Sequence, residues 1–405
     1  MSTPVHSPPT KMVKPYSLPQ ELTDKIVDAL FNANDQESIR ACSQVSRAFY
    51  YRSRYYIFRE VYLACHHDAE SLYDLCINSP DLCSCVESLI FTKIWDMDAN
   101  KFLLPLIKLL TKVTFIRISG LLWGWFPDDV LDASASLPLL TGSSLKNVYF
   151  NRGMRSFYSF ASRLRNLVAV TFEGGLISLR EESLEVVFRE AKPVAIKKIH
   201  IYSSPQSQVF IEGLFTSPAS PFCLRELQDV TFDVDPNTLV APELLPSSGD
   251  HDFTLLKRIV DESRESLMTL EIVSVNFIPP FDICLCHISD LRFIICEHPS
   301  QESVPISAIK WLIRGLVLPS HMKSARLSIA AMVIVGRESL WIQTTEGSEC
   351  FKCLDSILVD SRYPLQKFLV EFSELNEDQK DARKLAVIQN MPQLHKKGLL
   401  DIRLG

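Results

Sequence analysis

The sequence predicts an α/β fold in which a short N-terminal helical module precedes an irregular solenoid, with parallel strands on one face and helices on the other. Three observations predict it. The chain has 405 residues, which exceeds the length at which a single compact core usually stops growing. Apolar residues recur every four positions near the N-terminus. Strand-length apolar alternations then return down the rest of the chain.

Composition is that of an ordinary folded protein. Hydrophobic residues make up 47% and charged residues 22%, so we expect long disorder only at the ends. Residues 1–14 are rich in Pro, Ser and Thr and predict a flexible tail without the apolar segment of a signal peptide. The 11 cysteines are then expected to be reduced thiols in the cytoplasm or nucleus.

Charge and hydropathy also narrow the classes of partner. The formal net charge is −6, whereas binding along a phosphate backbone needs a dense basic face. No run of about 18 apolar residues occurs, so no membrane span is predicted. We therefore expect neither a nucleic-acid partner nor a membrane partner.

Residues 15–60 predict a module of three short helices. Pro19 suits the first turn of the first helix, and Asp35 and Ser46 can cap the second and third helices. The first helix carries an apolar stripe with a spacing of four residues, formed by Leu18, Leu22, Ile26 and Leu30.

Residues 61–405 predict the solenoid. Several strand candidates share a Leu-x-x-Leu-x-Phe-like core, and neighbouring candidates are roughly 20 to 40 residues apart. The strand candidates are 86–91, 113–118, 145–150, 167–172, 196–201, 227–232, 267–272, 291–295, 327–329, 357–359, 365–370 and 400–404. Helix-capable stretches between them are 182–191, 255–264 and 306–318. Stacked strand–helix units would form a parallel sheet with helices behind it.

The N-terminal module resembles an F-box. The similarity begins with Leu-Pro-x-Glu-Leu at 18–22, ends with Val-Ser-Arg-x-Phe at 45–49 and Ile-Phe at 57–58, and includes about ten positions in order. The Tyr-Tyr-Arg-x-Arg-Tyr-Tyr run at 50–56 is similar to F-box proteins abundant in mushroom-forming fungi. Residues 61–405 resemble leucine-rich repeats more loosely, with uneven spacing and no asparagine ladder.

This resemblance implies a substrate receptor. An F-box docks on the Skp-type adaptor of a cullin-RING ubiquitin ligase, and the solenoid would capture a protein substrate while other subunits perform catalysis. Carried over position by position, the adaptor-facing and core contacts would come from Leu18, Pro19, Leu22, Ile26, Leu30, Ile39, Val45 and Phe49.

Two other functions stay open. One is a scaffold whose F-box holds a Skp-type partner without substrate turnover, and the other is an enzyme of unrecognised type on an α/β core. The sequence contains no phosphate-binding glycine loop, no GxSxG elbow and no HExxH helix. We therefore expect no enzymatic activity, no cofactor, and no catalytic or metal-binding residues.

Three cysteine groups could bind metal or act in redox chemistry, or could simply pack. They are the pair Cys350 and Cys353, the cluster Cys284, Cys286 and His287, and the group Cys65, His66, His67, Cys76, Cys83 and Cys85. None offers two clean ligand pairs at zinc spacing, so packing is favoured. We expect Cys353 to point inward, and strand alternation to separate His287 from Cys284 and Cys286.

Two further groups have a binding and a structural interpretation. Trp123 and Trp125 could form an exposed recognition surface or could lie in the core beneath a loop. The arginines 47, 52, 54 and 59 could contact an acidic partner or nucleic acid, or could form a solvated face that flanks a partner, and the acidic net charge favours the solvated face.

Overall fold

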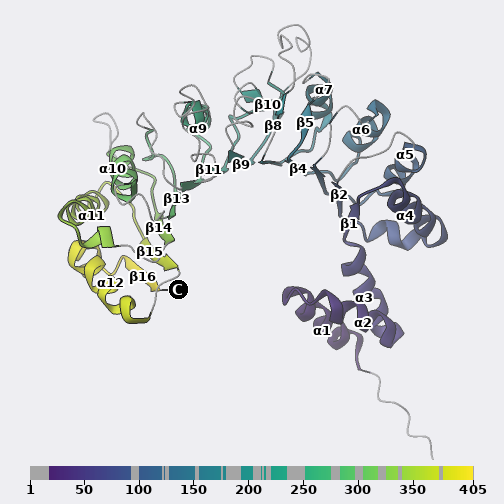
Figure 1. Cartoon of the computed structure of the whole chain (residues 1–405), viewed down its shortest axis with the longest axis horizontal. Coiled ribbons are helices and arrows are strands. Elements are labelled where there is room, and N and C mark those ends of the chain that lie inside the picture. The colour runs from purple at the N-terminus through teal and green to yellow at the C-terminus, as the bar shows by residue number, and fades with distance from the viewer. Residues whose placement is uncertain are drawn as a thin grey trace, which may run out of the picture.

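Alternating apolar and polar residues build one long parallel sheet, which curves into an arc with helices along its outer side (Figure 1). The sheet has 12 strands, and their order across the sheet follows their order along the chain. The predicted α/β class, with parallel strands and helices in separate layers, is confirmed. The computed structural model describes residues 18–92, 100–120, 123, 127–150, 155–174, 177–178, 193–203, 211, 214–215, 220–234, 251–274, 283–296, 304–317, 325–335, 340–373 and 377–404.

Each strand of the large sheet pairs in parallel with the next one. The strands are β1 Glu60–Leu63, β2 Ser88–Thr92, β3 Phe115–Ser119, β4 Gly142–Lys146, β6 Ala169–Glu173, β9 Lys198–Ser203, β11 Asp229–Val234, β12 Thr269–Ser274, β13 Asp290–Cys296, β14 Ile329–Val335, β15 Lys367–Ser373 and β16 Leu400–Leu404. Two short parallel pairs lie outside this sheet, β5 Tyr149–Phe150 with β7 Ile177–Ser178 and β8 Val194–Ala195 with β10 Phe222–Cys223.

Helices fill the connections between strands. They are α1 Gln20–Asn32, α2 Gln36–Val45, α3 Arg47–Phe58, α4 His66–Asn78, α5 Asn100–Leu109, α6 Asp128–Ala135, α7 Arg155–Arg163, α9 His251–Glu262, α10 Val304–Leu316, α11 Thr345–Leu358, α12 Glu377–Asn390 and α13 Pro392–Lys396. Short 3-10 helices span Pro80–Ser84 and Leu340–Gln343. The first three helices form a separate bundle beside the start of the arc (Figure 1).

Alternate residues of each strand supply the core. In β6 the side chains of Val170 and Phe172 are buried while their neighbours are half-buried, and β11 repeats the pattern with Val230 and Phe232. The period of two sends one set of side chains toward the helices and the other toward the inner face of the arc. The apolar side chains form one continuous core along the solenoid.

Successive repeats leave the sheet through the same kind of turn. Gly120, Asn147 and Gly174 follow β3, β4 and β6, with φ values of 65°, 50° and 69°. Glycine adopts this left-handed conformation at little cost, and asparagine tolerates it. These strands also start at equal steps along the chain, so this stretch is more regular than the uneven spacing of the whole sequence indicates.

The N-terminal helices begin where their sequence predicts. The Oδ1 atom of Asp35 accepts a 3.0 Å hydrogen bond from the backbone N–H of Ser38, which caps α2. Pro19 directly precedes α1, one position before the expected first turn, and Ser46 precedes α3 without a side-chain capping bond.

Two strand predictions differ from the structure. The predicted strand 145–150 is divided between the end of β4 at Lys146 and the short strand β5 Tyr149–Phe150, with Asn147 in a turn between them. The predicted strand 357–359 is wrong, because it lies at the end of helix α11 and just beyond it. The predicted helix 182–191 and the tail 1–14 lie outside the described residues.

Candidate functional site

Apolar side chains at the start of α1 and along one side of it have no cover from the part of the chain that the structure describes. Leu22 and Ile26, four residues apart on α1, are 46% and 41% exposed, and Leu18, which precedes the helix, is 51% exposed. The adjacent side of the same helix carries Thr23 and Val27, which are buried. The helix therefore has two apolar faces, and only one of them belongs to the core.

A further apolar residue is exposed at the end of α2. Val45 is 70% exposed, and Pro19 is also exposed. Single exposed apolar residues are normal, but a group of them on one small helical bundle is typical of an interaction surface. We call Leu18, Pro19, Leu22, Ile26 and Val45 the apolar face.

The other residues carried over from the F-box resemblance lie deeper. Leu30 and Phe49 are half-buried, and Ile39 is fully buried within the helical bundle. Ile39 can therefore contribute to packing of the bundle but cannot itself touch a partner.

Helix α3 is held against α1 by a polar network. Arg52 donates to both oxygens of Asp28, at 2.6 and 3.1 Å, and the Tyr56 hydroxyl donates to Oδ1 at 3.0 Å. The Tyr56 ring stacks on Phe31 with centroids 4.1 Å apart. The hydrogen bond from Arg52 holds the pKa of Asp28 below its usual range. Arg52 thus has an internal structural partner rather than lying on a purely solvated face.

The same helix is tied to the solenoid through Glu87. This carboxylate accepts a 2.6 Å hydrogen bond from the Tyr55 hydroxyl and a 2.8 Å bond from Arg59 Nε. The Arg59 carbonyl in turn accepts from the backbone N–H groups of Glu87 and Ser88, both at 2.9 Å. Sequence reasoning missed Glu87, because its partners lie 28 and 32 residues away. The apolar face is consequently held at a defined orientation to the sheet.

Replacing Glu87 with alanine is expected to loosen this junction. The change removes the acceptor of two hydrogen bonds, which costs about 1–2 kcal/mol for half-buried groups. Hydrogen exchange of α3 amides should speed up roughly 5–30-fold. The matched control is Glu60→Ala, which removes only the acceptor of the exposed Tyr62 hydroxyl. Equal exchange in wild type and Glu87→Ala would contradict the assigned role.

The inner face of the arc carries both charged and apolar side chains. Ion pairs link neighbouring strands along it, such as Lys146 with Glu173 at 2.9 Å and Lys198 with Asp229 at 2.8 Å. Toward the C-terminus such ion pairs continue, and the register also aligns apolar side chains on adjacent strands. Val273 pairs with Ile294, and Ile294 with Val333.

Several polar atoms on the N-terminal part of the inner face lack partners within the described residues. They are Oγ of Ser88, Nε of Arg117, Oγ of Ser144 and Nε2 of His200, which lie on β2, β3, β4 and β9. Buried polar atoms usually have hydrogen-bond partners.

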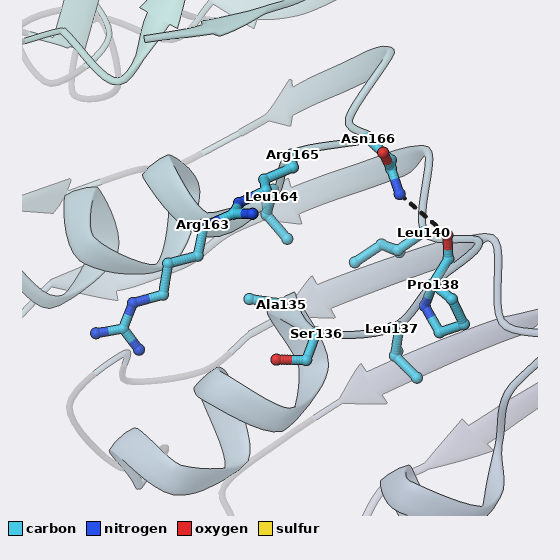
Figure 2. A pocket seen from close by; sticks show the side chains of 9 residues that line it. All are labelled: Ala135, Ser136, Leu137, Pro138, Leu140, Arg163, Leu164, Arg165 and Asn166. Atoms are coloured by element: carbon cyan, nitrogen blue, oxygen red, sulfur yellow. Dashed lines mark hydrogen bonds between the residues drawn. The ribbon is translucent and has the colours of Figure 1, made fainter. Parts of the chain in front are cut away.

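A pocket of about 360 Å³ lies between the turn after α6 and the turn after α7 (Figure 2). Its apolar lining includes Leu137, Leu140 and Leu164, and its charged lining residues are Arg163 and Arg165. Arg163 forms an ion pair with Asp132. The lining places no general base beside a nucleophile, so it gives the enzyme hypothesis no support.

The cysteine and tryptophan candidates differ in how far they are buried. On helix α11, Cys350 is buried and Cys353 is exposed. The prediction that Cys353 points inward is therefore wrong. Among the described residues, no three His, Cys, Asp or Glu side chains are grouped to hold a metal ion. Trp123 is a core residue, 5.2 Å from the ring of Phe157, and Trp125 lies outside the described residues.

Within the segments that the structure describes, no helix is long and apolar enough to cross a membrane. No family model matches the chain, and no curated protein matches its sequence with significance. The features that bear on function are therefore the apolar face, its rigid attachment and the inner face of the arc.

Proposed function

We propose that this protein is a substrate receptor of a Skp–cullin–F-box-type ubiquitin ligase, acting in the cytoplasm or nucleus. The helical bundle would dock on a Skp-type adaptor, and the inner face of the arc would capture a protein substrate. The observation that carries the proposal is the apolar face, because it leaves Leu22 and Ile26 exposed on a helix whose adjacent side is already packed.

Docking an apolar helical face in a partner's groove suits this arrangement. Burial of apolar area contributes about 25 cal/mol per Å², part of which is offset by the entropy lost on association. The Glu87 junction supports the proposal in a second way. A receptor must present its substrate at a defined distance from the adaptor, and this requires a stiff connection between the two binding surfaces.

Substrate capture is assigned to the inner face on chemical grounds. It offers a long row of charged and half-buried apolar side chains, such as Lys146, Lys198 and Ile294, which suits a protein segment better than a small metabolite. In this mechanism the chain itself breaks no bond. It brings a substrate lysine near a ubiquitin-charged enzyme held by the other subunits.

The test is a pull-down of a purified Skp-type adaptor by the full chain and by the double variant Leu18→Ala, Pro19→Ala. We expect wild-type binding and a loss of at least about 30-fold in the variant, because central apolar contacts each contribute more than about 1 kcal/mol. The matched control is Val317→Ala with Leu385→Ala, which truncates two side chains that are each 55% exposed on the solenoid. Absence of binding by the folded wild-type chain would overturn the proposal.

The alternative is a scaffold that binds the adaptor without a ligase. A scaffold would use the same apolar face to bind the adaptor. It would differ from a receptor only in whether the bound adaptor recruits a cullin. Recruitment of a cullin to the adaptor-bound chain would favour the receptor, whereas adaptor binding that excludes the cullin would favour the scaffold.

A further inference from the structure

A row of turns runs along the rim of the arc where the strands begin. The Thr114 carbonyl accepts a 2.9 Å hydrogen bond from the backbone N–H of Thr141, and the Thr141 carbonyl accepts a 2.7 Å bond from that of Val168. The Val168 carbonyl accepts in turn from the N–H of Lys197 at 2.9 Å. The turns before β3, β4, β6 and β9 are therefore stacked in order, at the usual spacing of about 4.8 Å between neighbouring strands.

This rim carries cationic side chains that nothing nearby neutralises. Lys112 lies in the turn before β3, Arg165 lies in the turn before β6, and Lys197 directly precedes β9. All three are exposed, and within the described residues none of them forms an ion pair. By contrast, Arg163 and Lys198 are each paired with an aspartate. The rim is thus locally positive in a chain whose net charge is −6.

An exposed apolar residue lies between these cations. Leu139, in the turn before β4, is 43% exposed. By register it is the counterpart of Lys112 in the preceding turn and of Asn166 in the following turn. The rim therefore presents an apolar side chain with positive charge on both sides of it.

The pocket of about 360 Å³ lies between the same turns (Figure 2). The Asn166 amide donates a 3.0 Å hydrogen bond to the Pro138 carbonyl, which fixes one bordering turn to the other. Arg165 belongs to the lining and brings one of the unpaired charges to it. The floor consists of core leucines that are at most 7% exposed, namely Leu137, Leu140 and Leu164. The pocket therefore suits an apolar side chain that has an acidic neighbour.

We propose that this rim binds an acidic segment of a protein partner, in which carboxylates flank an apolar side chain. The apolar side chain enters the pocket, and the carboxylates pair with Lys112, Arg165 and Lys197. Three strand spacings separate the first of these cations from the last, and an extended segment advances about 3.3 Å per residue. A segment of about five residues therefore reaches all of them.

Nucleic acid fits this rim less well than an acidic protein segment does. Binding along a phosphate backbone needs a dense basic face, and single strands are usually held by aromatic side chains on which bases stack. The described turns before β3, β4, β6 and β9 contain no aromatic residue, and the apolar floor of the pocket offers nothing to a phosphate. The rim uses no residue of the apolar face, so this proposal goes beyond the receptor function and does not rest on it.

Fluorescence anisotropy tests the proposal on the full chain with a labelled probe peptide, Gly-Asp-Glu-Leu-Asp-Glu-Gly. We expect saturable binding that weakens several-fold when the ionic strength rises from about 0.05 to about 0.3 M, because salt screens exposed ion pairs. A peptide with Asn and Gln in place of the acids, and one with Ser in place of Leu, should each bind at least about 10-fold more weakly. Absence of saturable binding by the acidic probe up to about 1 mM would overturn the proposal.

The double variant Arg165→Glu, Lys197→Glu reverses two charges of the rim. We expect about 10-fold weaker binding of the probe or more, because two attractions become repulsions. The matched control is Lys352→Glu with Lys396→Glu, which makes the same change in net charge at exposed positions on α11 and α13. Equal loss of binding in both double variants would mean that only the overall charge matters, and the proposed site would be wrong.

A labelled oligothymidylate probe distinguishes the other class of partner. We expect it to bind the wild-type chain more weakly than the acidic peptide does. Tighter binding of the oligonucleotide that is lost in the rim variant would assign the rim to nucleic acid and overturn the proposal. Both double variants should bind a Skp-type adaptor as the wild type does, so the adaptor proposal and this one can fail separately.

Discussion

Replacing Trp311 with alanine is expected to lower the free energy of unfolding by about 3–5 kcal/mol, the usual cost of removing a large buried aromatic side chain. Trp311 is 1% exposed on α10 and stacks on Phe293 of β13, with ring centroids 6.0 Å apart. It therefore joins a helix of the outer layer to a strand of the inner layer. Urea unfolding followed by circular dichroism measures the change.

The control is a truncation at the end of the same helix. Val317 directly follows α10 and is 55% exposed, so Val317→Ala should change the free energy of unfolding by no more than about 0.5 kcal/mol. Equal destabilisation by both variants would mean that the Trp311 packing contributes nothing specific.

The shape of the unfolding curve carries further information. In a solenoid each repeat contacts only its neighbours, so stability is close to a sum of repeat and interface contributions. The loss at Trp311 should therefore appear first in the repeats around β13 and β14. Hydrogen exchange should accelerate there before it does in β2 and β3.

Most strands could be predicted from sequence because their apolar residues alternate cleanly. The segment 267–272 overlaps β12, and 400–404 coincides with β16. The prediction at 145–150 missed the first three residues of β4 because of one residue. In β4, Ser143 takes the register position that Val170 holds in β6, which removes the apolar signal and shifts the apparent motif onto the next residues.

The strand predicted at 357–359 failed for a different reason. Ile357 and Val359 are too few to separate a period of two from a helical period. Within α11 the buried residues Phe351, Leu354 and Leu358 recur at helical spacing, and this longer pattern determines the structure.

The candidate site was only partly visible in the sequence. The stripe at Leu18, Leu22 and Ile26 follows from spacing alone, and its exposure became known only from the packed bundle. The Glu87 junction could not be predicted, since it depends on contacts between distant segments that no local pattern specifies.

Substitutions at two isoleucines of the helical bundle are expected to have different effects, one on adaptor binding and the other on stability. Ile26 is 41% exposed and Ile39 is fully buried. Ile26→Asp should leave the bundle folded but weaken adaptor binding by about 100-fold or more, because an unpaired carboxylate would be buried on docking. Ile39→Ala should lower the free energy of unfolding by about 2–4 kcal/mol, because it leaves a cavity in the bundle.

The pair separates docking from folding, because both residues come from the same resemblance and differ in exposure. Calorimetric titration with the Skp-type adaptor and thermal unfolding of each variant provide the two readouts. Ile39→Ala should bind in proportion to its folded fraction, whereas Ile26→Asp should lose binding at an unchanged melting temperature. If folded Ile26→Asp bound the adaptor as wild type does, the apolar face would not be the docking surface. The exposed row on α1 would then need a different partner.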